Sequence, residues 1–216
     1  MVTLQLRQIK VPPGQTIELE DVSWAEFELI LAELGNRRST RIAYNNKTLT
    51  IMSPLFKHEK DKVSLGDFVK VLLEELDIEH DSSGSTTLKR QGVGKGVEPD
   101  DSFYIQNYTR VLGKDRIDLN IDPPPDLAIE IDLTSKTQIE VYEALGVPEL
   151  WRYDSGHLRI NVLEAGKYVQ SERSLLFPNW PVDYMAKKYI MRTREIGRSK
   201  SIKELRRQVR KRISDT

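Results

Sequence analysis

The segment 123–132, with the sequence PPPDLAIEID, places two acidic side chains at a spacing that could do chemistry. Its three prolines cannot donate to a β-sheet and therefore mark where a strand begins. Side chains alternate between the two faces of a strand, so Glu130 and Asp132 leave one face and the apolar Leu127, Ile129 and Ile131 leave the other. Two like charges at this spacing repel each other unless water, a cation or a metal ion separates them. We therefore expect function at this strand.

A third acidic residue, Asp100, follows Pro99 and opens another predicted strand. If the two strands are neighbours in one sheet, Asp100, Glu130 and Asp132 converge on one spot. Carboxylate oxygens are the ligands that Mg²⁺ or Mn²⁺ prefers, with water completing an octahedron. Such an ion stabilises charge on a phosphoryl oxygen and lowers the pKa of a bound water. A nearby lysine would bind the phosphate or position the water.

Each of these residues also has a structural interpretation. Asp100 could begin a strand or cap a turn, and Asp132 could end its strand and pair with Lys136. Glu59, a further acidic candidate at the start of the helix predicted over 58–76, could be an ordinary residue of a first helical turn, favoured there by the helix dipole. Glu130 is different, because a mid-strand glutamate between isoleucines requires either a solvent-exposed face or a partner.

The elements that must position these residues follow from hydrophobic periodicity and turn residues. Helices are predicted over 23–34, 58–76 and 134–146, with Ser23 and Glu26 forming a capping box at the first. Strands are predicted over 41–52 (a hairpin), 85–91, 102–105, 126–132, 149–154 and 158–163. The order is that of a mixed α/β fold, and the strand–helix–strand run from 126 to 153 allows a right-handed crossover.

Composition narrows the class of protein. The chain has 216 residues and no cysteine, which excludes disulfides and cysteine-based zinc sites. No apolar run approaches the roughly 20 residues that span a bilayer, and residues 1–10 lack the apolar core of a signal peptide. We therefore expect a cytoplasmic protein without a membrane-spanning segment.

The net charge of zero hides an asymmetry between the body and the C-terminal end. Residues 186–216 hold 12 Lys or Arg against 3 acidic residues, whereas the rest of the chain holds 21 against 30. We expect a domain over 1–185 followed by a basic helical tail over 186–216. The tail could bind nucleic acid through Arg206, Arg207 and Arg210, or it could be a solvated helix that neutralises the acidic body.

Four motifs together resemble those of a known family. They are Met52-Ser53-Pro54 with His58-Glu59, then Glu98-Pro99-Asp100, then 125–131, and finally 146–153 with the sequence GVPELWRY. The chain resembles, from about Ser23 to Pro181, a large family of bacterial putative restriction endonucleases in the PD-(D/E)XK nuclease superfamily. The resemblance implies a restriction-endonuclease-like central mixed sheet flanked by helices, a Mg²⁺ (or Mn²⁺) cofactor and hydrolysis of DNA phosphodiesters.

Carried over residue by residue, the resemblance makes Asp100 and Glu130 metal ligands and catalytic residues. Glu59 matches an acidic helix residue that several members bring to the metal, and Asp132 is a further candidate ligand. The superfamily pattern expects Glu-x-Lys, but Asp132 stands where that lysine belongs. Lys136 is the first candidate to replace it as a catalytic residue. Lys89 or Arg90 offers a second route to the same pocket and to the nucleic acid.

Two hypotheses of different classes follow. The first is a metal-dependent DNA endonuclease, and because many nucleases of this fold pair to cut both strands, a homodimer is expected with it. The second is a non-catalytic module that binds nucleic acid or protein on a nuclease scaffold, suggested by the acid at the lysine position.

Overall fold

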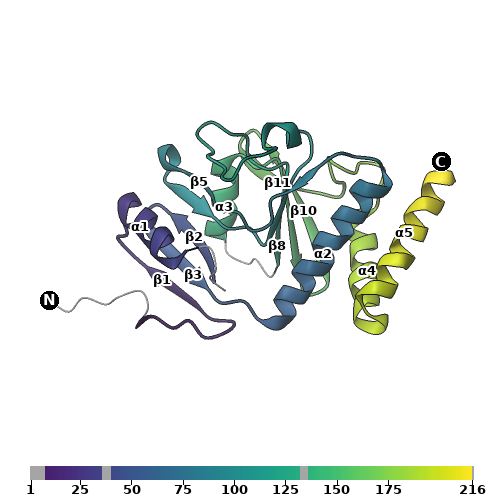
Figure 1. Cartoon of the computed structure of the whole chain (residues 1–216), viewed down its shortest axis with the longest axis horizontal. Coiled ribbons are helices and arrows are strands. Elements are labelled where there is room, and N and C mark those ends of the chain that lie inside the picture. Colours follow the sequence, from purple (N-terminus) through teal and green to yellow (C-terminus); the bar gives the residue numbers. More distant parts are fainter. Residues whose placement is uncertain (1–7, 36–39, 132–135, 216) are drawn as a thin grey trace.

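The computed structural model describes residues 8–35, 40–131 and 136–215, and these form two β-sheets with five helices (Figure 1). The first sheet is antiparallel, in the order β1-β3-β2-β6-β5. Its strands are β1 (Thr16–Leu19), β2 (Arg41–Asn45), β3 (Thr48–Met52), β5 (Leu88–Arg90) and β6 (Lys95–Val97).

The second sheet is mixed, in the order β11-β10-β9-β8-β7-β4, and only its β8–β9 pair is parallel. Its strands are β4 (Asp81–Ser82), β7 (Asp101–Tyr104), β8 (Leu127–Ile131), β9 (Glu149–Asp154), β10 (His157–Glu164) and β11 (Lys167–Ser171). The helices are α1 (Trp24–Leu34), α2 (Phe56–Glu75), α3 (Lys136–Leu145), α4 (Val182–Ile196) and α5 (Arg198–Ser214). The predicted mixed α/β class with a central mixed sheet between helices is confirmed.

Local sequence signals account for several of these elements. Ser23 and Glu26 form the predicted capping box, since the Ser23 hydroxyl accepts from the Glu26 backbone N–H and the Glu26 carboxylate accepts from the Ser23 N–H. Asn46 and Lys47 both have positive φ, 46° and 72°, which matches the two-residue turn that joins twisted strands. These two residues connect β2 and β3 in the predicted hairpin.

Strand β8 lies in the core, between two apolar layers. Leu127, Ile129 and Ile131 pack with α2, β9 and α4, whereas Ala128 packs with α3. All five residues of β8, Glu130 included, are buried. The expectation of a strand with one apolar and one carboxylate-bearing face is therefore incomplete. The crossover helix α3 covers the second face, as is usual where neighbouring strands are parallel.

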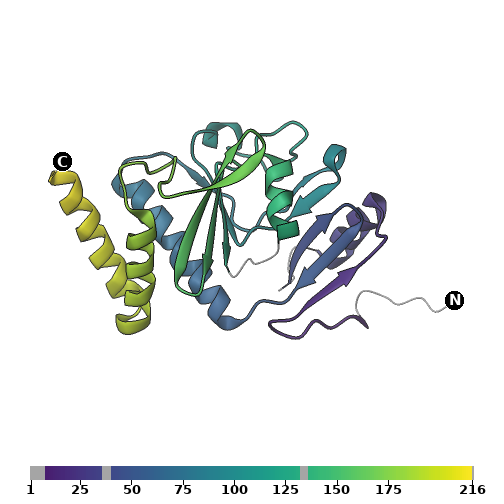
Figure 2. The same cartoon turned by 180° about the vertical axis from the view of Figure 1, so that it is seen from behind.

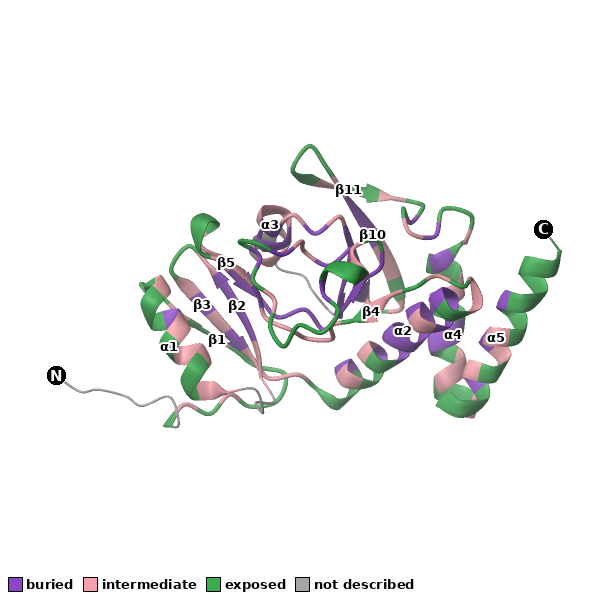
Figure 3. Cartoon of the chain, turned by 45° about the horizontal axis from the view of Figure 1, so that its top comes forward, coloured by how far each residue is buried: buried purple, intermediate pink, exposed green. Residues whose placement is uncertain are grey.

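The C-terminal helices pack on the outside of α2 (Figures 1 and 2). Leu205 and Val209 of α5 belong to the same buried cluster as β8 and α2. Figure 3 shows the middle of α2 largely buried, whereas most of α5 is exposed. The expected boundary between 185 and 186 falls inside α4 (Val182–Ile196). No helix among the described residues is long and apolar enough to cross a membrane.

Candidate active site

The structure brings Asp100 and Glu130 together from adjacent strands. Asp101 on β7 is opposite Ile129 on β8, and the N–H of Asp100 donates to the Ile129 carbonyl at 3.1 Å. Continuing this antiparallel register by one residue places Asp100 opposite Glu130. Both side chains are buried, with 1% of Asp100 and 9% of Glu130 exposed. Two carboxylates thus share one water-poor location.

This proximity changes the acidity of Glu130. Burial raises the pKa of Glu130 well above its ordinary value, and the nearby Asp100 charge raises it further. Tyr142 on α3 opposes this effect, because its hydroxyl donates a hydrogen bond to Oε1 of Glu130. Glu130 therefore has the buried partner that its position between isoleucines requires.

Arg41 and His58 supply the positive and potentially positive groups at this site. Nε2 of His58, in the first turn of α2, lies 3.1 Å from Oδ2 of Asp100. Nε of Arg41, at the start of β2, lies 3.8 Å from Oδ1 of the same carboxylate. The side chain of Arg41 is only 16% exposed, so its charge acts on Asp100 with little screening by water.

Glu59 lies at the outer side of these groups rather than against Asp100. Its Oε1 is 3.6 Å from the Arg41 guanidinium and 3.7 Å from Nδ1 of His58. Within the described part of the chain, Oε1 of Glu59 and Nε of Arg41 are buried atoms that make no hydrogen bond. A bound polar ligand would supply the hydrogen bonds that this buried acceptor and this buried donor lack.

Two predicted site residues cannot be placed. Asp132 lies outside the described residues. Lys136 is the first residue of α3, which follows Glu130 in the chain, and its side chain is likewise outside the described part.

Lys89 and Arg90 have partners elsewhere. Lys89 forms an ion pair with Glu28 of α1. Arg90 donates from Nε to the carbonyl of Leu119 at 2.9 Å, and from its guanidinium to the carbonyl of Leu145 at 3.4 Å. Both side chains therefore hold neighbouring elements together.

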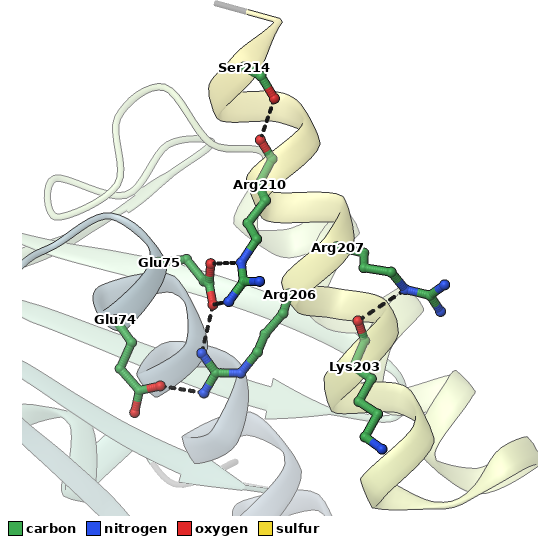
Figure 4. Close-up of polar contacts among 7 residues, drawn as sticks. All are labelled: Glu74, Glu75, Lys203, Arg206, Arg207, Arg210 and Ser214. Carbon is green, nitrogen blue, oxygen red and sulfur yellow. Dashed lines mark hydrogen bonds and ion pairs between the residues drawn. The ribbon is translucent and has the colours of Figure 1, made fainter.

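The predicted nucleic-acid-binding arginines of the tail point in two directions (Figure 4). Arg206 and Arg210 contact Glu75 of α2 at 2.7 Å and 2.6 Å, and Arg206 also contacts Glu74. Arg207 lies on another side of α5, where its Nε donates to the backbone carbonyl of Lys203 at 3.3 Å. Arg206 and Arg210 thus help to hold α5 on α2, whereas Arg207 faces away.

The donor set at Asp100 and Glu130 fits a hard divalent cation. Among the described residues, no group of three or more acidic or histidine side chains is arranged to hold a metal. Mg²⁺, however, commonly binds through one or two carboxylates and keeps several waters. A cation between Asp100 and Glu130 would also remove the repulsion that disfavours ionised Glu130.

Sequence reasoning missed Arg41 and Tyr142 as parts of the site. In the sequence, Arg41 stands at the start of the predicted hairpin over 41–52, and Tyr142 lies within the predicted helix over 134–146. Nothing in their local spacing marks them, because each reaches the carboxylates through packing between elements. His58 had a signal, since it stands beside Glu59 in a motif used for the resemblance.

Comparison with known proteins agrees with the motifs. Residues 24–183 match the family model Uma2, described as putative restriction endonuclease. The chain belongs to this family. The Uma2 match confirms the resemblance drawn from the sequence motifs, and it spans every described site residue from Arg41 to Tyr142.

One solved structure similar to this Uma2 chain is the crystal structure of a putative nuclease belonging to DUF820 from Anabaena variabilis ATCC 29413. Its TM-score is 0.48, with 18% sequence identity over 68% of this chain and 82% of that chain. No curated protein matches the chain.

Proposed function

We propose that this protein is a metal-dependent endonuclease that hydrolyses DNA phosphodiester bonds. The observation that carries the proposal is the buried Asp100–Glu130 pair with Arg41 and His58 against it, in a chain of the putative restriction endonuclease family. Buried like charges next to a guanidinium are costly to maintain in a purely structural role.

Asp100 and Glu130 would hold Mg²⁺ or Mn²⁺, with Glu59 and Asp132 as further candidate ligands. When bound, such an ion supplies Lewis-acid polarisation of the phosphoryl group. Tyr142 holds Glu130 in place through its hydrogen bond. His58 lies against Asp100 and positions its carboxylate.

Arg41 is the residue that we propose in place of the missing lysine. Its guanidinium lies beside Asp100 and Glu59, where it can bind the scissile phosphate and stabilise the charge that develops on it. Lys136, at the beginning of α3, remains a second candidate for this role.

The test is cleavage of supercoiled plasmid DNA in Mg²⁺ and in Mn²⁺ by wild type and by the Glu130→Ala variant. We expect nicked and linear products from wild type and none from the variant. If both are equally inert on plasmid, linear and single-stranded DNA across both metals, the proposal is wrong. We expect a homodimer, which would cut both DNA strands. Sedimentation at the concentration of the assay measures the oligomeric state.

A second candidate function is DNA binding without cleavage, favoured by the outer face of α5. Lys200, Lys203, Arg207 and Lys211 are all exposed, and their spacing places them on one helix face. The apolar Leu205 and Val209 are on the opposite, buried face. Salt-dependent DNA binding that survives Glu130→Ala, and is lost on changing these four residues to glutamine, would support this function. Unchanged binding by that variant would exclude it.

A further inference from the structure

A row of four charged residues crosses the mixed sheet at the level of the carboxylate pair. The strand register pairs Glu130 of β8 with Arg152 of β9, and Arg152 with Arg159 of β10. Register partners on adjacent strands place their side chains on the same face. Across the strands the order is Asp100, Glu130, Arg152 and Arg159. The two acidic residues thus form one end of the row, and the two arginines form the other end. The three strands β8, β9 and β10 lie side by side in Figure 2.

The two arginines form an unusual like-charge pair. Directly opposed like charges on neighbouring strands destabilise a sheet. Arg152 is half-buried, and its Nε donates to Oδ1 of the buried Asn161 at 2.9 Å. Burial and the neighbouring Arg159 charge lower the pKa of the Arg152 guanidinium. Its hydrogen bond to an amide oxygen orients the guanidinium without neutralising it.

Among the described residues, ion pairs compensate these charges only weakly. Within residues 8–35, 40–131 and 136–215, Arg152 makes no ion pair. Among these same residues, Arg159 has a single ion pair, to Asp154, at the long distance of 3.9 Å. The Arg159 side chain is 42% exposed, so the outer end of the row is open to a ligand. An anion placed between the two guanidinium groups would remove their repulsion.

We propose that Arg152 and Arg159 bind a backbone phosphate of the DNA strand, next to the phosphate that reacts at Asp100 and Glu130. Adjacent strands are about 5 Å apart, so the backbones of Arg152 and Arg159 lie about 5 and 10 Å from that of Glu130 along the row. A planar guanidinium suits a phosphate because it donates two parallel hydrogen bonds. The choice of DNA as the polyanion rests on the proposed function.

The test measures DNA binding separately from cleavage. A short fluorescein-labelled DNA duplex is titrated in EDTA, with anisotropy as the readout, against wild type and the double variant Arg152→Gln/Arg159→Gln. The matched control, Arg110→Gln/Arg116→Gln, removes the same charge from an exposed loop. We expect the double variant to bind at least about tenfold more weakly, with the slope of log K against log salt reduced by about 2. The control should keep the affinity and the slope of wild type.

A stability measurement excludes misfolding as the cause. The Arg159→Gln variant removes one of the two opposed like charges. Its thermal midpoint should therefore be no lower than that of wild type. Inorganic phosphate should raise the midpoint of wild type more than chloride of equal ionic strength does, and this difference should vanish in the double variant. If the double variant binds DNA like the control, or if both lose affinity equally, the arginine row is not a phosphate site.

The outcome is separable from that of the proposed function. If wild type cleaves DNA and the double variant binds and cleaves like wild type, the row proposal fails while the nuclease stands. If the double variant loses binding in a protein that never cleaves, the row proposal stands while the nuclease fails. For an active enzyme, we expect the double variant to raise KM more than it lowers kcat.

Discussion

Oδ2 of Asp100 accepts a hydrogen bond from the backbone N–H of Ile131 at 2.8 Å. This bond ties the side chain that precedes β7 to the residue directly after Glu130. Because a backbone group in the core strand makes it, the separation of the two carboxylates is fixed by the sheet. Such preorganisation is what a metal or phosphate site needs, since the binding groups do not have to be ordered when the ligand arrives.

Glu130→Gln should abolish cleavage without unfolding the protein. Burial disfavours the charged form of Glu130, so an uncharged isostere removes a cost of folding while it also removes the metal ligand. We expect cleavage at least about a hundredfold lower and an unchanged or higher free energy of unfolding. Plasmid cleavage and urea denaturation of the same preparations test this.

Glu149→Gln is the matched control for that variant. Glu149 is a buried glutamate on the adjacent strand β9, where it accepts from the indole N–H of Trp151 and from the Leu175 N–H at 2.8 Å. The Glu149→Gln variant should be less stable than wild type, because its hydrogen-bond network is weakened, and it should still cleave DNA. Equal loss of cleavage in both variants would show that Glu130 acts through folding alone.

Arg41→Met should separate catalysis from metal binding. If Arg41 stabilises the phosphate, its loss lowers cleavage by about 10²- to 10³-fold. Affinity for Mn²⁺, measured by calorimetry, should not fall, because a neighbouring positive charge opposes cation binding. Arg41→Lys keeps the charge and should recover part of the activity. Loss of Mn²⁺ affinity in parallel with loss of cleavage would contradict this role.

Tyr142→Phe should act on the site through Glu130. Loss of the hydroxyl removes a hydrogen bond that lowers the pKa of Glu130, so that pKa rises further. At a given pH less Glu130 is ionised, and the pH at which Mn²⁺ binding is half-maximal should increase. Calorimetric titrations across neutral and alkaline pH measure the shift.

Tyr168→Phe is the control for the loss of a buried hydroxyl. The Tyr168 hydroxyl donates to the carbonyl of Val147 at 2.7 Å. Each variant should lose about 1 kcal/mol of stability with its hydrogen bond, but only Tyr142→Phe should move the pH dependence. A shift of equal size in both would mean that general loosening causes it.

Local sequence patterns predicted most of the fold. The capping box at Ser23 and Glu26 and the hairpin turn at Asn46 are set by residues within a few positions of each other. The strand predicted over 126–132 is found as β8 (Leu127–Ile131), and the strand predicted after Pro99-Asp100 is found as β7 (Asp101–Tyr104), because strand alternation and breakers are local signals.

The remaining features depend on contacts between distant segments. Arg41 reaches Asp100 only because the start of β2 packs near the start of α2, and Arg206 meets Glu75 across 131 residues of sequence. The charge count alone left the tail open to two interpretations, a DNA-binding arm or a neutralising helix. The ion pairs with α2 favour neutralisation for Arg206 and Arg210 but leave Arg207 exposed.

The docking of α5 on α2 should weaken in acid. Hydrogen bonds and charge from Arg210 and Arg206 lower the pKa of Glu75. A carboxyl whose folded-state pKa is depressed stabilises the fold above its unfolded pKa of about 4.3, and this contribution is lost as the pH falls through the folded value. Amide hydrogen exchange in α5 should therefore accelerate as the pH falls below the unfolded pKa and through the folded-state pKa of Glu75.

Glu75→Gln should remove this acid sensitivity and cost roughly 0.5–1 kcal/mol at neutral pH, a small value because water screens the exposed arginines. The control is Glu79→Gln, an exposed glutamate just beyond α2, which should keep the wild-type pH profile. High salt should reduce the difference between wild type and Glu75→Gln, since it screens the ion pairs. If α5 exchanges at the same rate in both proteins at neutral pH and low salt, apolar packing of Leu205 and Val209 holds the helix without help from Glu75.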